Sequence, residues 1–281
     1  MILTIPKRAI AILLALAVIA AATVAAVKAE PQTVRLPVLM YHHLSEKSRS
    51  WGAYVISPEQ FRNDLIYLRD QGYQTITAAQ LVLFAAGKAE LPEKPVLITF
   101  DDGYESFYAY AFPILKELEM SAVLSVIGTY TEQYSNATDH NVQYAHVTWD
   151  EIAEMANTGL VEIGNHTYNL HTLKDRKGCR IKQGENEDAY RKMLADDLQM
   201  LQDKVKEVTG QEPIVFTYPY GSICSQGCEL VRQMGFPISL GCEEKVNRLT
   251  PGDPDSLQTL KRFNRAYGKS SEAFLSPILN Q

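Results

Sequence analysis

The stretch Pro95-Val96-Leu97-Ile98-Thr99-Phe100-Asp101-Asp102-Gly103 decides how this sequence is interpreted. Its first six residues are almost all apolar, which is typical of a parallel strand that is covered on both faces. Two carboxylates and a glycine follow, so the strand ends in a sharp turn. Such a tripeptide alone is usually a solvated turn, but a buried strand before it favours delivery of both carboxylates into a cleft.

The rest of the sequence alternates short apolar runs with helical patterns. Strands are expected at residues 36–41, 74–77, 95–100, 122–127, 160–163, 214–218, 237–240 and 260–263. Capping and glycine signals predict helices at residues 57–72, 78–86, 107–119, 148–159 and 187–208. This alternation predicts one α/β domain, and a closed or distorted barrel fits its length. Residues 129–146 and 172–186 are expected to be long loops.

The amino terminus carries an export pattern. Lys7 and Arg8 precede an apolar run of residues 9–27, and small residues then lead to the polar Glu30. The pattern is typical of a signal peptide, although the run is long enough to span a bilayer if it is not cleaved. We therefore expect residues 1–29 to be a signal peptide or membrane anchor. Residues 30–281 would then form one domain outside the cell or at its surface.

The exported part is acidic. Residues 1–29 hold three cationic side chains and no acids, so their removal leaves 24 Lys and Arg against 33 Asp and Glu. This balance argues against nucleic acid or an anionic lipid surface as the main partner. We separately expect the protein to be a monomer.

The cysteine count fits an exported domain. An even number of cysteines makes disulfides the first expectation there, with the pairing left open. A four-cysteine zinc site and free buried thiols are the alternatives. The four residues are Cys179, Cys224, Cys228 and Cys242.

Polar clusters fall where the predicted strands end, and in a barrel these ends lie on the face where active sites are built. The clusters are Tyr41-His42-His43, Asp101-Asp102-Gly103, His166-Thr167-x-x-x-His171, Tyr218-Pro219-Tyr220-Gly221 and Arg262 to Arg265. His166 and His171 are five residues apart, so they cannot share one face of a continuous helix. With a carboxylate from a neighbouring strand they supply two imidazoles and one carboxylate, a set typical of an open catalytic zinc site. Cobalt, nickel or iron suit similar ligands.

These residues resemble a known family, the polysaccharide deacetylases with a NodB homology domain (carbohydrate esterase family 4). Residues 99–104, Thr-Phe-Asp-Asp-Gly-Tyr, look like its first motif, and His166 to His171 look like its second. The resemblance covers about residues 35–265 and implies a distorted (β/α)7 barrel. It also implies that Asp101 is the general base and that Asp102, His166 and His171 bind a divalent metal.

The third motif of the family is incomplete. Residues 216–221 resemble it, but Thr217 stands where the family has an Arg that braces the catalytic Asp. Arg262 and Arg265 are the candidates to replace that Arg. In the family, the backbone N–H of the residue that matches Tyr220 helps to bind the oxyanion.

The last motif of the family, Leu-x-His, is absent, because no histidine follows His171. Residues 36–43 instead resemble the start of a branch with a permuted motif order, which includes deacetylases of poly-N-acetylglucosamine. The resemblance implies that His42 is the general acid. His43 either orients His42, contacts substrate, or is a strand-end residue.

Aromatic and histidine side chains near these motifs could contact a sugar. Tyr104 and Tyr168 are candidates for stacking on sugar rings, although packing is the commoner role of an aromatic. His140 and His146 are expected at the surface or on the substrate rim. Two residues are expected to support the ligand loop, Asn165 and Thr167.

The sequence therefore predicts a metal-dependent hydrolase that removes N-acetyl groups from an exported polysaccharide of poly-N-acetylglucosamine or peptidoglycan type. Two other functions stay open. A barrel glycosidase needs two acids about 5 to 9.5 Å apart across a glycosidic bond, which adjacent Asp101 and Asp102 fit poorly. A non-catalytic carbohydrate-binding protein is favoured by the missing Arg at Thr217, but the presence of base, acid and metal ligands argues against it.

Overall fold

Strand β6 (Pro95–Phe100) is the centre of the fold, and all six of its residues are buried. In the computed structural model, which describes residues 33–281, β6 pairs in parallel with β2 (Val38–Tyr41) and β7 (Ala122–Val126). Both neighbours are also buried throughout, as expected for a parallel sheet with two covered faces. The predicted signal peptide or anchor lies outside the described residues.

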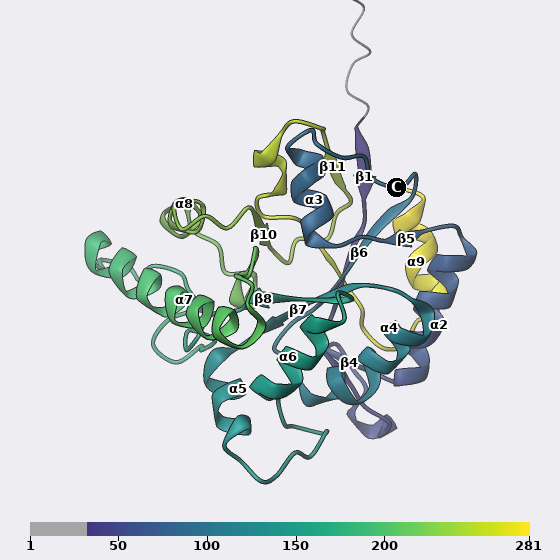
Figure 1. Cartoon of the computed structure of the whole chain (residues 1–281), viewed down its shortest axis with the longest axis horizontal. Coiled ribbons are helices and arrows are strands. Elements are labelled where there is room, and N and C mark those ends of the chain that lie inside the picture. Colours follow the sequence, from purple (N-terminus) through teal and green to yellow (C-terminus); the bar gives the residue numbers. More distant parts are fainter. Residues whose placement is uncertain (1–32) are drawn as a thin grey trace, which may run out of the picture. The chain divides into compact units, whose positions relative to one another are not determined.

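The parallel strands form one curled sheet in the order β10-β9-β8-β7-β6-β2-β12, with β5 beside β6 (Figure 1). The further strands are β5 (Gln74–Thr75), β8 (Val161–Asn165), β9 (Val215–Thr217), β10 (Ile238–Leu240) and β12 (Phe263–Asn264). The segment before β12 closes the sheet on itself. Leu260 exchanges backbone hydrogen bonds with Ser239 and Gly241 beside β10, while Phe263 and Asn264 pair with β2. The predicted distorted (β/α)7 barrel is confirmed.

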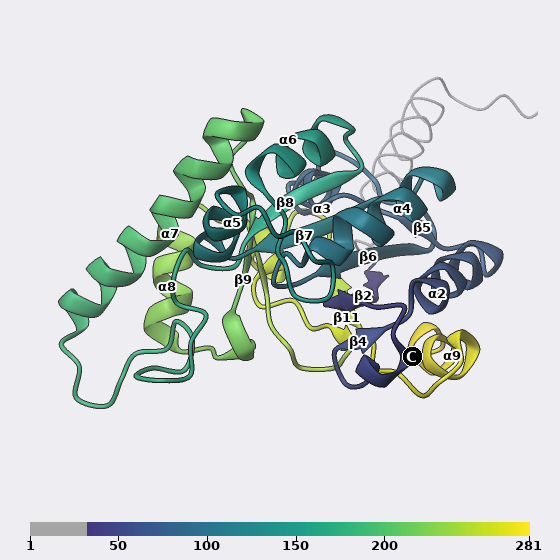
Figure 2. The ribbon, with the colours of Figure 1, turned by 90° about the horizontal axis from the view of Figure 1, so that it is seen from below.

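Helices cover the outside of this barrel, with α7 and α8 packed together on one side and α2 and α9 on another (Figures 1 and 2). They are α2 (Pro58–Asp70), α3 (Ala78–Ala85), α4 (Phe112–Leu118), α5 (Gly128–Ser135), α6 (Trp149–Asn157), α7 (Glu187–Thr209), α8 (Ser225–Gln233) and α9 (Ser271–Leu279). The side chains of Ser57, Thr77 and Thr148 cap three of them by accepting the N–H three residues ahead. None of the helices in residues 33–281 has the length and apolar composition that a membrane span requires.

Two short strand pairs flank the sheet, β1 (Val34–Leu36) with β11 (Asn247–Leu249) and β3 (His43–Leu44) with β4 (Val55–Ile56). The structure corrects several predicted boundaries. Pro37, which has no N–H to donate, separates β1 from β2 in the predicted 36–41 strand. The predicted 107–119 helix opens with a π-helical turn, Phe107–Ala111. Helix α5 occupies part of the predicted 129–146 loop, and the 260–263 strand is displaced to β12.

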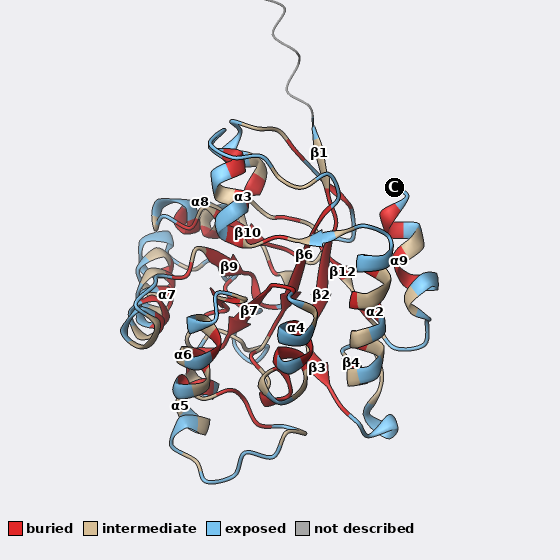
Figure 3. Cartoon of the chain, turned by 45° about the vertical axis from the view of Figure 1, so that its right-hand side comes forward, coloured by how far each residue is buried: buried red, intermediate tan, exposed pale blue. Residues whose placement is uncertain are grey.

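The core follows the alternation of the strands. Leu39 and Ile98 belong to one apolar cluster with α2, α4 and α6, whereas their neighbours Val38 and Leu97 belong to another with α3. Figure 3 shows buried strands surrounded by helices whose outer faces are exposed. Both faces of the sheet are therefore covered by apolar contacts. The polar residues at its strand ends are exceptions to this apolar composition.

The four cysteines are free thiols, contrary to the expectation of disulfides. Cys179 is buried, and the hydroxyl of Tyr190 donates to its carbonyl at 2.8 Å. The same hydroxyl lies 3.4 Å from the Sγ atom of Cys224. Among the described residues, the one set that could hold a metal contains no cysteine, so the four-cysteine zinc alternative is not borne out.

Candidate active site

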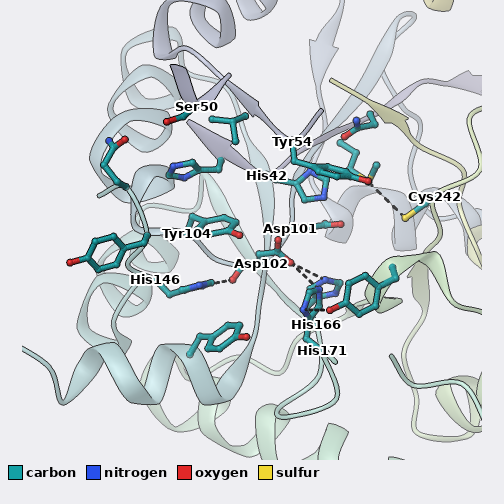
Figure 4. A pocket seen from close by; sticks show the side chains of 18 of the residues that line it. His42, Ser50, Tyr54, Asp101, Asp102, Tyr104, His146, His166, His171 and Cys242 are labelled. Atoms are coloured by element: carbon teal, nitrogen blue, oxygen red, sulfur yellow. Dashed lines mark hydrogen bonds and ion pairs between the residues drawn. The ribbon is translucent and has the colours of Figure 1, made fainter. Parts of the chain in front are cut away.

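The carboxyl ends of the barrel strands open into a cavity of about 960 Å³ (Figure 4). All five of the predicted clusters contribute to its lining, the Arg262 to Arg265 cluster through Asn264. The other four supply His42 and His43 after β2, Asp101, Asp102 and Tyr104 after β6, His166 and His171 after β8, and Tyr220 after β9. The structure thus brings together His42 and Tyr220, which lie 178 positions apart in the sequence.

The turn after β6 is strained. Asp102 and Gly103 are both left-handed, with φ values of 72° and 70°. A Cβ at position 103 would lie 3.0 Å from the side chain of Val126, so a glycine is required there. For Asp102 this conformation is uncommon, and such strain concentrates at functional sites.

His166 and His171 both direct Nε2 at Asp102. The two Nε2 atoms lie 3.4 and 3.3 Å from Asp102 Oδ1. Nδ1 of His166 is 2.8 Å from the carbonyl oxygen of Thr217, which can only accept, so this ring donates from Nδ1. In the neutral form of the ring, Nε2 is then available to bind a metal. Nδ1 of His171 is 3.1 Å from the hydroxyl of Tyr220, which permits the same tautomer. The three ligand atoms lie within 4.8 Å of one another and fit a divalent cation.

The protonation states of Asp102 and His171 also suit a cation. Burial alone would raise the pKa of Asp102, but the hydrogen bond and charge of His166 outweigh it and hold that pKa far below its ordinary value. Burial and the neighbouring His166 lower the pKa of His171 to about 4. Burial alone would lower the pKa of His166, but the hydrogen bond to Asp102 and the charges of Asp101 and Asp102 outweigh it and raise that pKa. Metal binding would therefore displace a proton from His166, because an ionised carboxylate and neutral imidazoles are the forms in which these side chains bind metals.

The partner of Asp101 is Arg262, which lies immediately before β12. Its guanidinium donates to both carboxylate oxygens at 2.7 and 2.8 Å, and its Nε donates to the carbonyl of Gly241 at 2.7 Å. Arg262 is fully buried and Asp101 nearly so. Burial alone would raise the pKa of Asp101, but the guanidinium outweighs it and keeps that pKa below its ordinary value. The carboxylate is therefore held ionised.

Thr217, in the place of the Arg of the third motif, has a different set of contacts. Its hydroxyl bonds to that of Ser125 at 2.7 Å, and its carbonyl accepts from His166. Arg265, the other candidate, pairs instead with the buried carboxylate of Asp64 at 2.7 Å. Of the two predicted replacements, Arg262 is thus the one that braces Asp101.

His42 approaches the two carboxylates from the side opposite the His166 and His171 pair (Figure 4). Its Nδ1 is buried and has no hydrogen-bond partner among the described residues. The ring of Tyr54 packs edge-on against it, with 4.8 Å between centroids. Burial lowers the pKa of His42, while Asp101 and Asp102 oppose that shift.

His43 is fixed in place. Its Nδ1 lies 2.8 Å from the hydroxyl of Ser106, and its ring packs against Tyr104 at 4.8 Å. Burial and the neighbouring His146 lower the pKa of His43 to about 4. His43 therefore forms part of the cavity wall and is held there through Nδ1, whereas Nδ1 of His42 has no hydrogen-bond partner among the described residues.

His146 is closer to the site than the sequence indicated. It is 7% exposed, lines the cavity, and places Nδ1 2.8 Å from the backbone carbonyl of Asp102. Tyr104 and Tyr130 pack on its ring at 4.7 and 4.6 Å. A β-bridge between Tyr104 and His146 brings this residue to the cavity. Such a long-range contact leaves no local motif in the sequence. His140 is exposed, as expected.

The two predicted sugar-stacking tyrosines differ in position. Tyr104 lines the cavity, but Tyr168 is not among the lining residues. The ring of Tyr168 covers Gly128, where a Cβ would collide with it, so its role is packing. Further lining residues that the sequence did not indicate are Met40, Ser50, Tyr54, Val55, Tyr130, Gln143, Tyr144, Cys242 and Glu244.

The parallel barrel and the Asp102, His166 and His171 set at its strand ends agree with the class that the sequence motifs resemble, the carbohydrate esterases with a NodB homology domain. The sequence profile described as polysaccharide deacetylase matches residues 88–239, which is more than half of the chain. The chain belongs to the polysaccharide deacetylase family.

Named relatives agree with this assignment. The poly-β-1,6-N-acetyl-D-glucosamine N-deacetylase of Escherichia coli (strain K12) is 26% identical over 263 residues, which cover 86% of this chain and 38% of the relative. The chain thus spans under two-fifths of that protein. The enzyme of the same name from Staphylococcus aureus (strain MSSA476) is 27% identical over 203 residues, 72% of this chain and 65% of the relative. The structure of IcaB from Ammonifex degensii matches with a TM-score of 0.71 and 29% identity, covering 90% of this chain and all of that one.

Proposed function

We propose that this protein is a metal-dependent hydrolase that removes N-acetyl groups from poly-N-acetylglucosamine outside the cell. The observation that carries the proposal is the convergence of Asp102, His166 and His171 beside ionised Asp101 and unpartnered His42 in one cavity. The names of the Escherichia coli and Staphylococcus aureus relatives support the choice of polymer. Peptidoglycan is the second candidate substrate.

The residues divide the chemistry of amide hydrolysis between them. A divalent cation, with zinc the first candidate, would supply a Lewis acid that brings the pKa of a water from about 15.7 to roughly 7. Asp101, held ionised by Arg262, takes a proton from the attacking water. The backbone N–H of Tyr220 donates to the developing oxyanion, a contribution of about 3 to 4 kcal/mol where such donors have been removed. His42 protonates the departing amine, which otherwise would leave as an amide anion.

The structure gives less support to the other two functions. Asp101 is engaged by Arg262 and Asp102 faces two imidazoles, so the adjacent acids do not act as the opposed pair of a glycosidase. The missing Arg of the third motif favoured a non-catalytic binding protein. Arg262 supplies that guanidinium from another segment, so this feature no longer argues for loss of activity.

Acetate release tests the proposal. We expect the purified chain to release acetate from poly-β-1,6-N-acetylglucosamine, to lose this activity on chelation and to regain it when zinc is added back. Peptidoglycan and acetylated chitooligosaccharides, assayed in parallel, would rank the candidate polymers. Release of reducing ends without acetate would indicate a glycosidase. Stoichiometric metal without acetate from any of these polymers would indicate a binding protein.

The role of His42 is tested separately. His42→Ala is expected to keep the metal and lower kcat by about 10²- to 10⁴-fold, the usual contribution of a general acid. His140→Ala is the matched control, because His140 is an exposed histidine outside the cavity. Equal kcat values for the two variants would assign the acid to another residue.

A further inference from the structure

The loop that carries both candidate histidine ligands contains a strained residue. Thr167, directly after His166, is left-handed with a φ of 71°. A β-branched residue rarely adopts this conformation, so its surroundings must stabilise it. The turn also exposes consecutive backbone N–H groups, and such groups after a left-handed residue form a concave anion-binding surface.

Asp197 of helix α7 fills this concave surface. Its Oδ1 accepts the N–H of Tyr168 and its Oδ2 accepts the N–H of Asn169, each at 2.8 Å. Hydrogen bonds to an ionised carboxylate are stronger than those between neutral groups. Burial raises the pKa of Asp197 above its ordinary value, and the two N–H groups offset only part of this rise. The carboxylate therefore binds the middle of the loop, between His166 and His171.

Helix α7 also anchors the start of the loop. The side-chain amide of Asn165 donates to the carbonyl of Leu198 at 3.0 Å, and its Oδ1 accepts the N–H of Thr167 at 2.9 Å. This contact fixes the chain before His166. The segment that separates His166 from His171 is bonded to α7 through Asp197, so Asp197 controls where the second imidazole lies relative to the first.

We propose that Asp197 is a positioning residue of the metal site, which holds the His166–His171 loop so that both Nε2 atoms face Asp102. The proposal rests on the metal site of the proposed function. It assigns to α7 a part in metal affinity although Asp197 does not line the cavity. Loss of a group that orients metal ligands lowers metal affinity by about 10- to 100-fold.

Two neighbouring aspartates allow a matched test in the full chain. Asp197→Asn keeps the shape of the side chain but replaces one acceptor by a donor that faces an N–H group. Asp196→Asn removes the same charge from the adjacent residue, whose side chain is 63% exposed and pairs with Lys192. Competition with a chromophoric chelator would give the zinc Kd of each variant. We expect Asp197→Asn to raise Kd by about 10- to 100-fold and Asp196→Asn to leave it within twofold of wild type.

A second measurement is independent of metal. Hydrogen exchange of the Tyr168 and Asn169 amides in the metal-free protein should be slow in wild type and Asp196→Asn, and fast in Asp197→Asn. If Asp197→Asn does not fold, Asp197→Glu keeps the charge on a longer side chain, and we expect it to bind zinc less tightly than wild type. Equal zinc Kd values for the Asp196 and Asp197 variants, or unchanged exchange, would overturn the proposal. Failure of wild type itself to bind zinc would instead overturn the proposed function. The exchange measurement would still decide whether Asp197 holds the Tyr168 and Asn169 amides.

Discussion

Asp101 and Asp102 are adjacent in the chain, yet their side chains have different partners. Both oxygens of Asp101 accept from Arg262, whereas Asp102 faces the two imidazoles. Adjacent side chains that leave a strand point in different directions, and the left-handed turn at Asp102 increases this divergence. One turn can therefore supply both a proton acceptor and a metal ligand.

The Asp101–Arg262 pair leads to a prediction about the pH dependence of activity. In Arg262→Met, burial of Asp101 is no longer opposed by the guanidinium, so the pKa of Asp101 should rise. The acidic limb of the kcat/KM profile should then move to higher pH, because the base ionises only there. We also expect a loss of about 3 to 5 kcal/mol in the free energy of unfolding, since one partner of a buried ion pair is removed.

Arg265→Met is the control for this prediction. Arg265 is the other fully buried arginine that pairs with an aspartate, Asp64, and it does not line the cavity. Its loss should lower stability but leave the acidic limb in place. If the acidic limb of the kcat/KM profile lies at the same pH in both variants, Arg262 does not set the ionisation of Asp101.

At the residue level, the sequence predicted the site residues that lie in short local motifs. The Asp-Asp-Gly turn and the two histidines are local patterns, and the structure brings them together as expected. Arg262 was only one of two candidates, because it lies 161 positions from Asp101 and a pairing across the barrel has no local signal. His146 was placed too far out for the same reason.

At the element level, a side-chain cap made the start of one helix predictable, and another helix without such a cap was missed. Helix α6 begins at a capping box formed by Thr148 and Glu151, and its start was predicted correctly. Helix α5 begins after Ile127, which makes no side-chain cap, so this helix was taken for part of a loop. Its misassignment also hid Tyr130, which lines the cavity.

The capping box of α6 adjoins a second acid that should make stability depend on pH. Glu105 is 7% exposed, and burial followed by the charge of Glu151 raises its pKa to about 8. The folded protein thus holds a proton that the unfolded chain releases near the ordinary value. The contribution of Glu105 to the free energy of unfolding is complete below the ordinary pKa of a glutamate. It is lost as the pH rises through the folded-state pKa of about 8.

The test is the melting temperature between pH 6 and pH 9. Wild-type Tm should fall over this range, and Glu105→Gln should flatten the curve because its amide does not ionise; each kcal/mol corresponds to roughly 2 to 4 °C in a domain of this size. Glu154→Gln is the control. Glu154 is an exposed acid on α6, the helix of Glu151, and its carboxylate accepts a hydrogen bond from Tyr108. Parallel curves for wild type and Glu105→Gln would contradict this account of Glu105.

At the scale of the whole molecule, strand and helix alternation predicted one α/β domain with a closed or distorted barrel, and the family resemblance implied its (β/α)7 form. The irregular form of its closure was not visible in the sequence, because β12 has only two residues and the contact to β10 is a single bridge at Leu260. This irregular segment nevertheless matters for the site, since it carries Arg262 between the two contacts. The closure of the barrel therefore delivers the guanidinium that the third motif lacks.

The claim on which the account depends is that one cation binds between β6 and β8. Crystals of the full chain grown with zinc, measured on both sides of the zinc absorption edge, would locate that cation directly. The account predicts one anomalous peak about 2.0 to 2.2 Å from Asp102 Oδ1, His166 Nε2 and His171 Nε2. A cavity without such a peak, or a peak held by other side chains, would contradict it.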